Sequence, residues 1–205
     1  MDGWSTRPAH SILNNNTYFV KQHVALLTKA FDILDPQREE VILECREGKL
    51  EFFTKARRID LWLGIRKSAP FDVVIKTPAG EPVLRVKRGT SWHNASVEVL
   101  NEAGERIGGF KHKWWPLGRN FNVLNEAGET ICFIDGSLLG REFTFRSSND
   151  VQLAHISKKW VGLLKELFTF ADNYSVEIKE TVPPDNNMRA LILAGALVID
   201  LLIHD

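Results

Sequence analysis

The feature of this sequence that most constrains its fold is a turn motif that recurs at a fixed spacing. The triplet Ala-Gly-Glu stands at residues 79–81, 103–105 and 127–129, 24 residues apart each time. Runs of alternating apolar and polar residues precede and follow each triplet, and such alternation is typical of strands with one buried face. Glycine in a short polar segment supplies the turn. Each 24-residue unit is therefore predicted to be a β-hairpin with its connection.

The same pattern extends beyond the repeat in a looser form. One hairpin is predicted around 31–45, another around 143–156, and a first strand over 18–27. A unit of 24 residues is shorter than the roughly 40 residues of a propeller blade. At least ten antiparallel strands in series favour a meander that closes as a barrel or folds as a sandwich.

The chain ends in a segment that predicts a helix apolar on every face. Two prolines, an Asp and two Asn at 183–187 form a helix start with candidate N-caps. A helix of this kind is wrapped in protein or embedded in lipid. The uninterrupted apolar run 190–199 has ten residues, whereas a membrane span needs about 20. We therefore predict a core helix over about 187–203, which strands approach closely at Gly195 and its neighbouring alanines.

Length and composition indicate one globular domain. The chain has 205 residues, of which 44% are apolar and 25% charged. These values are close to the average of soluble domains and exclude disordered and collagen-like chains. We expect a flexible tail over 1–16 and a single domain over 17–205. No secretion signal opens the sequence, so a cytoplasmic location is expected.

Charge and cysteine usage narrow the classes of partner. The 26 basic residues balance 26 acidic residues, whereas a duplex-DNA surface usually carries an excess of base, so no nucleic acid is expected as a partner. Two cysteines cannot form a four-cysteine zinc site. Cys45 and Cys132 both fall in strand patterns and are predicted to be buried thiols.

The sequence carries none of the common catalytic or cofactor-binding motifs. The sequence contains no glycine-rich phosphate loop, no nucleophile elbow, no Cys-x-x-Cys and no His-Glu-x-x-His motif. Its six histidines form no pair at ligand spacing. We therefore predict no hydrolytic or redox active site, no cofactor and no metal site.

The strongest candidate for a binding surface is the basic segment 55–67. Its five basic residues surround Leu61-Trp62-Leu63, and basic residues that flank an aromatic wedge suit an anionic membrane surface. In the alternative interpretation, the Leu and Trp side chains pack into the core and the charges stay in water. Both interpretations stay open. The candidate lipid-binding residues of this segment are Lys55, Arg57, Arg58, Trp62, Arg66 and Lys67.

Two shorter segments repeat the combination of base and aromatic ring. Lys111 and Lys113 precede a pair of tryptophans, and Lys158 and Lys159 precede another tryptophan. At the rim of a barrel, such side chains would hold a phosphorylated headgroup. Alternatively, the tryptophans pack over the mouth of the barrel. The four lysines join the candidate lipid-binding residues.

Three blocks of sequence, 107–129, 155–174 and 188–200, resemble phospholipid scramblases in their order and spacing. The most specific signal is Ile-Ser-Lys-Lys-Trp at 156–160, followed by Phe-x-x-Ala-Asp-Asn-Tyr at 168–174. The resemblance is closest to the bacterial scramblase-related branch, and extends more distantly to plant LURP-one-related proteins and the tubby C-terminal domain. It implies a mainly β fold, a closed antiparallel barrel of about twelve strands around a central hydrophobic C-terminal helix.

The animal relatives have a proposed EF-hand-like calcium loop, which falls on residues 170–181 of this chain. Its first and last positions carry Phe and Thr here, and calcium needs at least about six oxygen ligands. Asp172 and Asn173 alone do not supply them. We predict no tight calcium site, and a strand in which Val176 and Ile178 face inward.

Two functions stay open at this stage. In the first, the protein is a peripheral membrane protein of the scramblase family that binds anionic phospholipid and moves it between leaflets. In the second, it is a soluble tubby-like barrel that binds a protein or a small ligand and moves no lipid. The cysteine cluster that anchors the animal relatives is replaced by residues 88–94. Asp200 in the apolar helix is either solvated near the rim or paired with a lysine from a strand.

Overall fold

The structure, a computed structural model, describes residues 11–24, 29–47, 70–89, 96–112, 121–137, 141–158 and 173–203. These residues form a short 3-10 helix, twelve β-strands and one α-helix. The first elements are η1 Ser11–Asn14, β1 Thr17–Val24, β2 Lys29–Asp35, β3 Glu40–Glu47, β4 Phe71–Lys76, β5 Pro82–Arg88 and β6 Val97–Asn101. The remaining elements are β7 Arg106–His112, β8 Phe121–Leu124, β9 Thr130–Gly136, β10 Glu142–Ser147, β11 Gln152–Ser157, β12 Asn173–Ile178 and α2 Asn187–Ile203.

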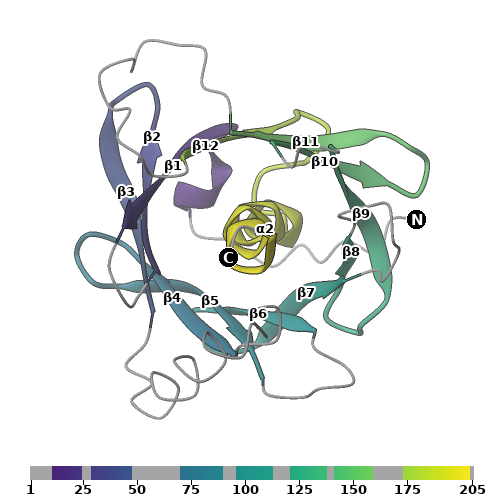
Figure 1. The fold of residues 1–205 in the computed structure, drawn as a ribbon, viewed down its shortest axis with the longest axis horizontal. Coiled ribbons are helices and arrows are strands. Elements are labelled where there is room, and N and C mark those ends of the chain that lie inside the picture. Colours follow the sequence, from purple (N-terminus) through teal and green to yellow (C-terminus); the bar gives the residue numbers. More distant parts are fainter. Residues whose placement is uncertain are drawn as a thin grey trace.

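The strands form one closed barrel (Figure 1). Each strand pairs antiparallel with its neighbours in the sequence, and β1 pairs with β12, where Tyr18 lies opposite Val176. The predicted meander is confirmed, and the β1–β12 pairing makes it a barrel rather than a sandwich. Because the ring is closed, it has no unpaired strand edge.

The repeated Ala-Gly-Glu triplets form tight turns, as predicted. Their glycines, Gly80, Gly104 and Gly128, have φ angles of +90°, +78° and +85°, which glycine adopts without steric cost. In two of the turns, an Asn before the triplet accepts a hydrogen bond from the backbone amide of the triplet's Glu, at 2.9 Å in both. The hairpins predicted around 31–45 and 143–156 form as well.

Helix α2 runs through the inside of the barrel (Figure 1). Asn186 caps it, because its side-chain oxygen accepts the backbone amide of Met188 at 2.8 Å. Every residue from 190 to 201 is buried. An eight-stranded barrel is just filled by its own side chains, so the wider ring of twelve strands needs a further element inside it. The predicted hydrophobic core helix is confirmed.

Both cysteines lie in this core. Cys45 on β3 and Cys132 on β9 are completely buried, as predicted, and the sulfur of Cys132 is 3.9 Å from that of Met188 on α2. Burial raises the pKa of Cys132 to about 12 and also raises that of Cys45. Both thiols are therefore protonated and unreactive at neutral pH.

No helix within the described ranges has the length and apolarity needed to cross a membrane.

Arg189 fixes the start of α2 to the segment that precedes β1. The side chain is only 2% exposed, and burial lowers its pKa. Its guanidinium donates hydrogen bonds of 2.7–3.0 Å to four backbone carbonyls and one side-chain amide oxygen. These acceptors belong to Asn14, Asn15, Asn16, Val182 and Pro183.

One boundary differs from the expected one. Residues 11–16 pack against the barrel, with Leu13 buried, so the ordered domain starts before residue 17. Residues 1–10 lie outside the described residues. Strand β1 is described up to Val24, and the rest of the predicted strand, 25–27, lies outside the described residues.

The helix approaches the wall very closely at Gly195. A Cβ atom added there would lie 2.5 Å from Cζ of Phe145 on β10 and 3.3 Å from Cε1 of Phe110 on β7. The first distance is far inside van der Waals contact, so a larger side chain would force the ring or the helix to move. The predicted close approach at Gly195 is confirmed.

The variant Gly195→Val tests this fit. Glycine and valine differ little in helix propensity, so overpacking alone should lower the free energy of unfolding, by about 1–3 kcal/mol. Urea unfolding measures the change. The same substitution at Gly89, which has no atom within 4 Å of the added Cβ, should change stability by less than about 0.5 kcal/mol. Equal stability of the two variants would contradict the tight contact.

Candidate functional site

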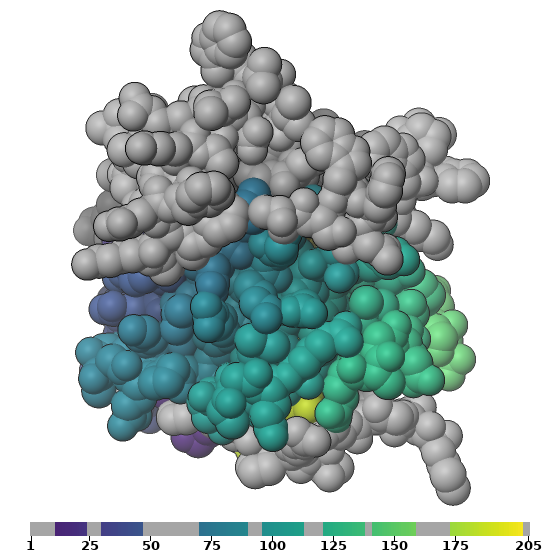
Figure 2. Space-filling model, turned by 90° about the horizontal axis from the view of Figure 1, so that it is seen from below, coloured from purple at the N-terminus to yellow at the C-terminus, as the bar shows by residue number. Residues whose placement is uncertain are grey.

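The alternating strand directions divide the connections between the two ends of the barrel. Five tight turns, η1 and the start of α2 lie at one end, which we call the turn end. The other six connections join strands at the opposite end of the barrel, where α2 also ends. We call this end the mouth. Between the two ends the wall is continuous, and its segments follow one another in chain order across the face seen in Figure 2.

The inward-facing rows of side chains become polar at the mouth. On β5, Arg88 lies opposite the buried Phe71 and Val97 and so faces inward. On β7, His112 lies opposite the buried Phe121. We define the mouth ring as six described polar residues near this end of the barrel: Gln22, Arg88, His112, Lys158, Tyr174 and Asp200.

A chain of contacts runs through the mouth ring. Asp200 on α2 is completely buried. The Tyr174 hydroxyl donates a hydrogen bond of 2.5 Å to one carboxylate oxygen of Asp200, and the Gln22 amide donates one of 3.2 Å to the other. The ammonium of Lys158 lies 5.2 Å from the centroid of the Tyr174 ring, within cation–π range. The buried carboxylate therefore orients Tyr174, and Tyr174 holds a cation at the mouth.

This geometry corrects one predicted placement of Asp200. The side chain is not solvated near the rim, because β1 and β12 contribute the residues that cover and hydrogen-bond it. Lys158, which directly follows β11, contacts the ring of Tyr174, and Tyr174 in turn hydrogen-bonds Asp200.

Two further members of the mouth ring add basic groups. Burial lowers the pKa of Arg88, yet a guanidinium stays charged at neutral pH because its ordinary value is so high. The ring of His112 packs edge-on against Phe121, with centroids 5.1 Å apart and planes at 81°. Arg88 and Lys158 thus bring two basic side chains to the end of the barrel where the Asp200 carboxylate is buried.

Two of the ten candidate lipid-binding residues, Lys111 and Lys158, lie in the part of the chain that the structure describes. Lys158 belongs to the mouth ring. Lys111 is exposed on the outer face of β7, next to His112. The other candidates lie outside the described residues: Lys55, Arg57, Arg58, Trp62, Arg66, Lys67, Lys113 and Lys159.

Sequence reasoning missed Arg88, His112, Tyr174 and Gln22 as members of a site. Along a strand, every second side chain faces the inside of the barrel. Each of these four residues belongs to such an inward-facing series, either within it or two residues beyond its last buried apolar side chain. That signal was available in the sequence. What it lacked was the pairing of the strands, which shows that these residues all lie toward the same end of the barrel.

The segment 170–181 forms a strand where it is described. Val176 and Ile178 of β12 are buried, as predicted, and Asn173 begins the strand. Asp172 lies outside the described residues, and the absence of a tight calcium site stays a prediction. Among the residues described, no three His, Cys, Asp or Glu side chains come close enough together to hold a metal ion.

Charge is divided unevenly between the two ends. The turns and adjoining strand ends of the turn end carry eleven acidic residues, and four basic ones that are not buried: Arg38, Lys76, Arg106 and Lys179. The sequence segments that join the strands at the mouth contain twelve Lys or Arg and four Asp or Glu. The described turn end is therefore acidic, whereas the sequence segments that join strands at the mouth are rich in Lys and Arg. The eleven acids are Asp35, Glu39, Glu40, Glu81, Glu102, Glu105, Glu126, Glu129, Asp150, Glu180 and Asp185.

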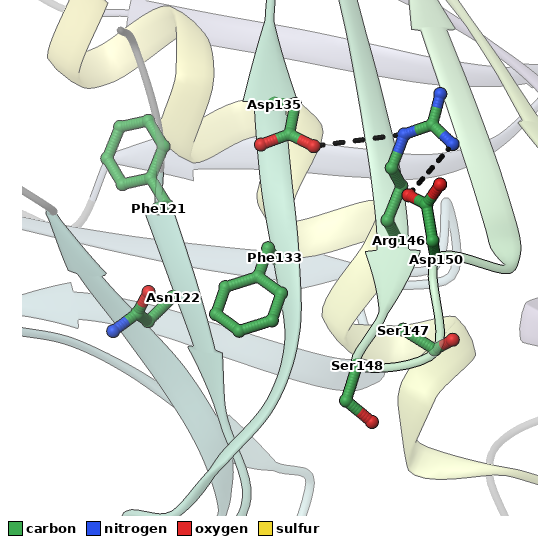
Figure 3. Close-up of a pocket in the computed structure, with 8 residues that line it drawn as sticks. All are labelled: Phe121, Asn122, Phe133, Asp135, Arg146, Ser147, Ser148 and Asp150. Atoms are coloured by element: carbon green, nitrogen blue, oxygen red, sulfur yellow. Dashed lines mark hydrogen bonds and ion pairs between the residues drawn. The ribbon is translucent and has the colours of Figure 1, made fainter.

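A shallow pocket of about 240 Å³ lies on the outer face of β8, β9 and β10 (Figure 3). The guanidinium of Arg146, which lines this pocket, lies 3.8 Å from the carboxylate of Asp135 and 3.3 Å from the carboxylate of Asp150. Figure 3 shows Phe133 between this cluster and Asn122. Two carboxylates beside one guanidinium leave the pocket net acidic, so an anionic headgroup fits it less well than it fits the mouth.

Comparison with a known family shows what kind of protein carries this geometry. The Scramblase family model matches residues 62–205, more than half of the chain. The chain belongs to the scramblase family. The resemblance to phospholipid scramblases is thus confirmed, whereas placement in the bacterial branch stays a prediction. The scramblase family is not a family of hydrolytic or redox enzymes.

Individual relatives agree with this assignment. Human phospholipid scramblase 2 is 24% identical over 153 residues, which cover 68% of this chain and 51% of that protein. Human phospholipid scramblase 1 is 26% identical over 152 residues, covering 67% and 47%. A phospholipid scramblase family protein of Schizosaccharomyces pombe is 27% identical over 110 residues, covering 50% and 29%. The chain spans about half the length of the scramblase 2 relatives that it matches.

A solved structure shares the fold of this scramblase-family chain. The X-ray structure of a protein from Arabidopsis thaliana superposes with a TM-score of 0.54 over 93% of this chain and 98% of that one, at 13% identity. At this identity the likeness concerns the fold alone. The expected fold class is confirmed, a tubby-like closed barrel of twelve antiparallel strands around a C-terminal helix.

The two tyrosines of the chain test the buried network, because each is buried and each hydroxyl donates one assigned hydrogen bond. Tyr174 donates to the carboxylate of Asp200, and Tyr18 donates to the backbone carbonyl of Ile12 at 3.0 Å. We expect Tyr174→Phe to lower the free energy of unfolding by about 1.5–3 kcal/mol, and Tyr18→Phe by about 0.5–1.5 kcal/mol. Urea unfolding of both variants gives the comparison. A loss no greater for Tyr174→Phe would contradict the network.

Proposed function

We propose that this scramblase-family protein is a peripheral membrane protein that binds anionic phospholipid at the mouth of its barrel. The mouth ring is the observation that carries the proposal, since Arg88 and Lys158 place two positive charges there. Exposed Lys111 adjoins the ring. A lipid phosphate accepts strong, charge-assisted hydrogen bonds from such groups.

In this proposal the basic segment 55–67 extends the lipid-binding surface. The strands that it joins, β3 and β4, end and begin at the mouth. A basic residue near an anionic membrane contributes about 1 kcal/mol, and Trp62 would add to binding by entering the interface. Lys113 and Lys159 follow close behind mouth residues in the sequence and belong to the same proposed surface.

Movement of lipid between leaflets is the second part of the proposal. The relatives are named phospholipid scramblases. In this chain the mouth would hold the headgroup by its phosphate, while the acyl chains stay in the bilayer. Helix α2 would remain in the barrel, because residues 190–201 are buried against the strands. The protein would therefore act on the bilayer from its surface.

The burial of α2 also supports a second candidate function. A barrel whose helix serves only as core can work as a soluble module that binds a protein or a small anionic ligand at its mouth. Both candidates use the mouth, and they differ in whether a bilayer takes part. A cytoplasmic location agrees with both and stays a prediction.

Flotation with vesicles tests lipid binding. The full chain is mixed with vesicles of phosphatidylcholine alone, or with about one third phosphatidylserine, at low and high salt. We expect flotation with the anionic vesicles at low salt and its loss at about 1 M salt, where the screening length falls to about 3 Å. Lys158→Gln should reduce the partition coefficient about fivefold, and the matched turn-end variant Lys76→Gln should leave it unchanged.

The outcomes separate the two functions. If no condition gives flotation, the membrane function is wrong and the soluble binding module stands. If the protein floats, a lipid-translocation assay with fluorescent phosphatidylserine in sealed vesicles follows. Binding without faster translocation would retain lipid binding and reject scrambling for this chain.

A further inference from the structure

We infer that the acidic turn end sets the orientation of the molecule at an anionic membrane, with the mouth toward the lipid and the turn end toward solvent. The inference rests on the proposed function. It goes further by identifying the charges that determine how the bound molecule is oriented. It concerns the turn-end acids defined above, which no lipid contact explains.

The wall of the barrel contributes little net charge to such an encounter. Its basic side chains are largely paired with acids on neighbouring strands. Arg85 forms a bidentate ion pair with Asp72, and the ammonium of Lys87 lies 3.1 Å from the carboxylate of Glu98. Because each pair sums to zero, a side-on approach gains little attraction. Among the described residues, the largest unbalanced charge therefore lies at the turn end.

The height of the wall separates the two ends electrically. A strand of six residues such as β4 is about 20 Å long at about 3.3 Å per residue. A tilt of about 40° from the barrel axis leaves a height of about 15 Å, whereas the screening length is about 8 Å at physiological salt. With the mouth on the membrane, the turn-end acids are beyond the range of the surface charge. With the molecule inverted, they would face the surface directly and be repelled.

The turn-end acids are well placed for this role because many are exposed. Glu81, Glu102 and Glu180 lie in different connections of the turn end, and all three side chains are exposed to solvent. Their charges therefore act on an approaching surface. A chain with no net charge can thus bind an anionic membrane in one orientation, because attraction and repulsion act at opposite ends.

Labels at the two ends read the orientation directly. A fluorophore is attached to Gly89→Cys at the mouth, or to Ala103→Cys at the turn end, both exposed positions. The native cysteines are buried and do not compete for label. With anionic vesicles that carry a headgroup nitroxide, we expect strong quenching of the mouth label and almost none of the turn-end label.

Charge reversal tests the part played by the acids. Glu81→Lys, Glu102→Lys and Glu180→Lys are combined in the Ala103→Cys background. We expect partition onto anionic vesicles to rise at least about tenfold at low salt, and the turn-end label to become quenched. On neutral vesicles the same protein should show no change. A second variant with Gln at the three positions changes the charge by half as much. It should also raise the partition onto anionic vesicles and the quenching of the turn-end label, but by less.

The results distinguish failure of the orientation from failure of lipid binding. Equal quenching of both labels on bound protein would overturn the orientation and leave the proposed function intact. Triple reversal without effect on the turn-end label would show that the acids do not decide it. No partition of the unmodified chain would reject both proposals together.

Discussion

The fold depends on one packing constraint: a ring of twelve strands encloses more space than its own side chains fill. Helix α2 fills that space, and its composition follows from this position. A helix surrounded by strands needs apolar side chains on every face, as residues 190–201 show, apart from Asp200. Gly195 is required where Phe145 approaches the helix most closely. Polar contacts hold both ends of α2, through Arg189 to the segment before β1 at the turn end and through Asp200 to β1 and β12 at the mouth.

Most of the architecture could be predicted from the sequence because its signals are local. The 24-residue repeat marks the turns, alternation marks the buried faces, and an unbroken apolar run followed by Asp200 marks the core helix. Closure could not be predicted in this way, since the pairing of β1 with β12 joins residues more than 150 positions apart, such as Tyr18 and Val176. Resemblance to a family supplied the barrel where periodicity alone left a sandwich open.

The mouth ring could be predicted only in part for the same reason. Lys158 was identified from its basic and aromatic neighbours in the sequence. Arg88 and Gln22 have no such local signal, and become part of a site only when the register of the strands is known. Asp200 was recognised as unusual, but its partners come from β1 and β12 and could not be inferred from α2 alone. The physical picture is a rigid barrel with a polar mouth, whose apolar helix supports the wall and whose two ends differ in charge.

The reactivity of the native thiols tests most directly whether α2 stays inside the barrel. Cys132 contacts Met188 of α2, and both Cys132 and Cys45 are buried with raised pKa values. The full chain is treated with a thiol reagent in buffer, on anionic vesicles and in denaturant, and the modified cysteines are identified by mass spectrometry. If α2 stays in the barrel, both thiols should react as slowly on vesicles as in buffer, and rapidly only in denaturant. Rapid modification of Cys132 on vesicles would show that α2 leaves the barrel, and would contradict the account.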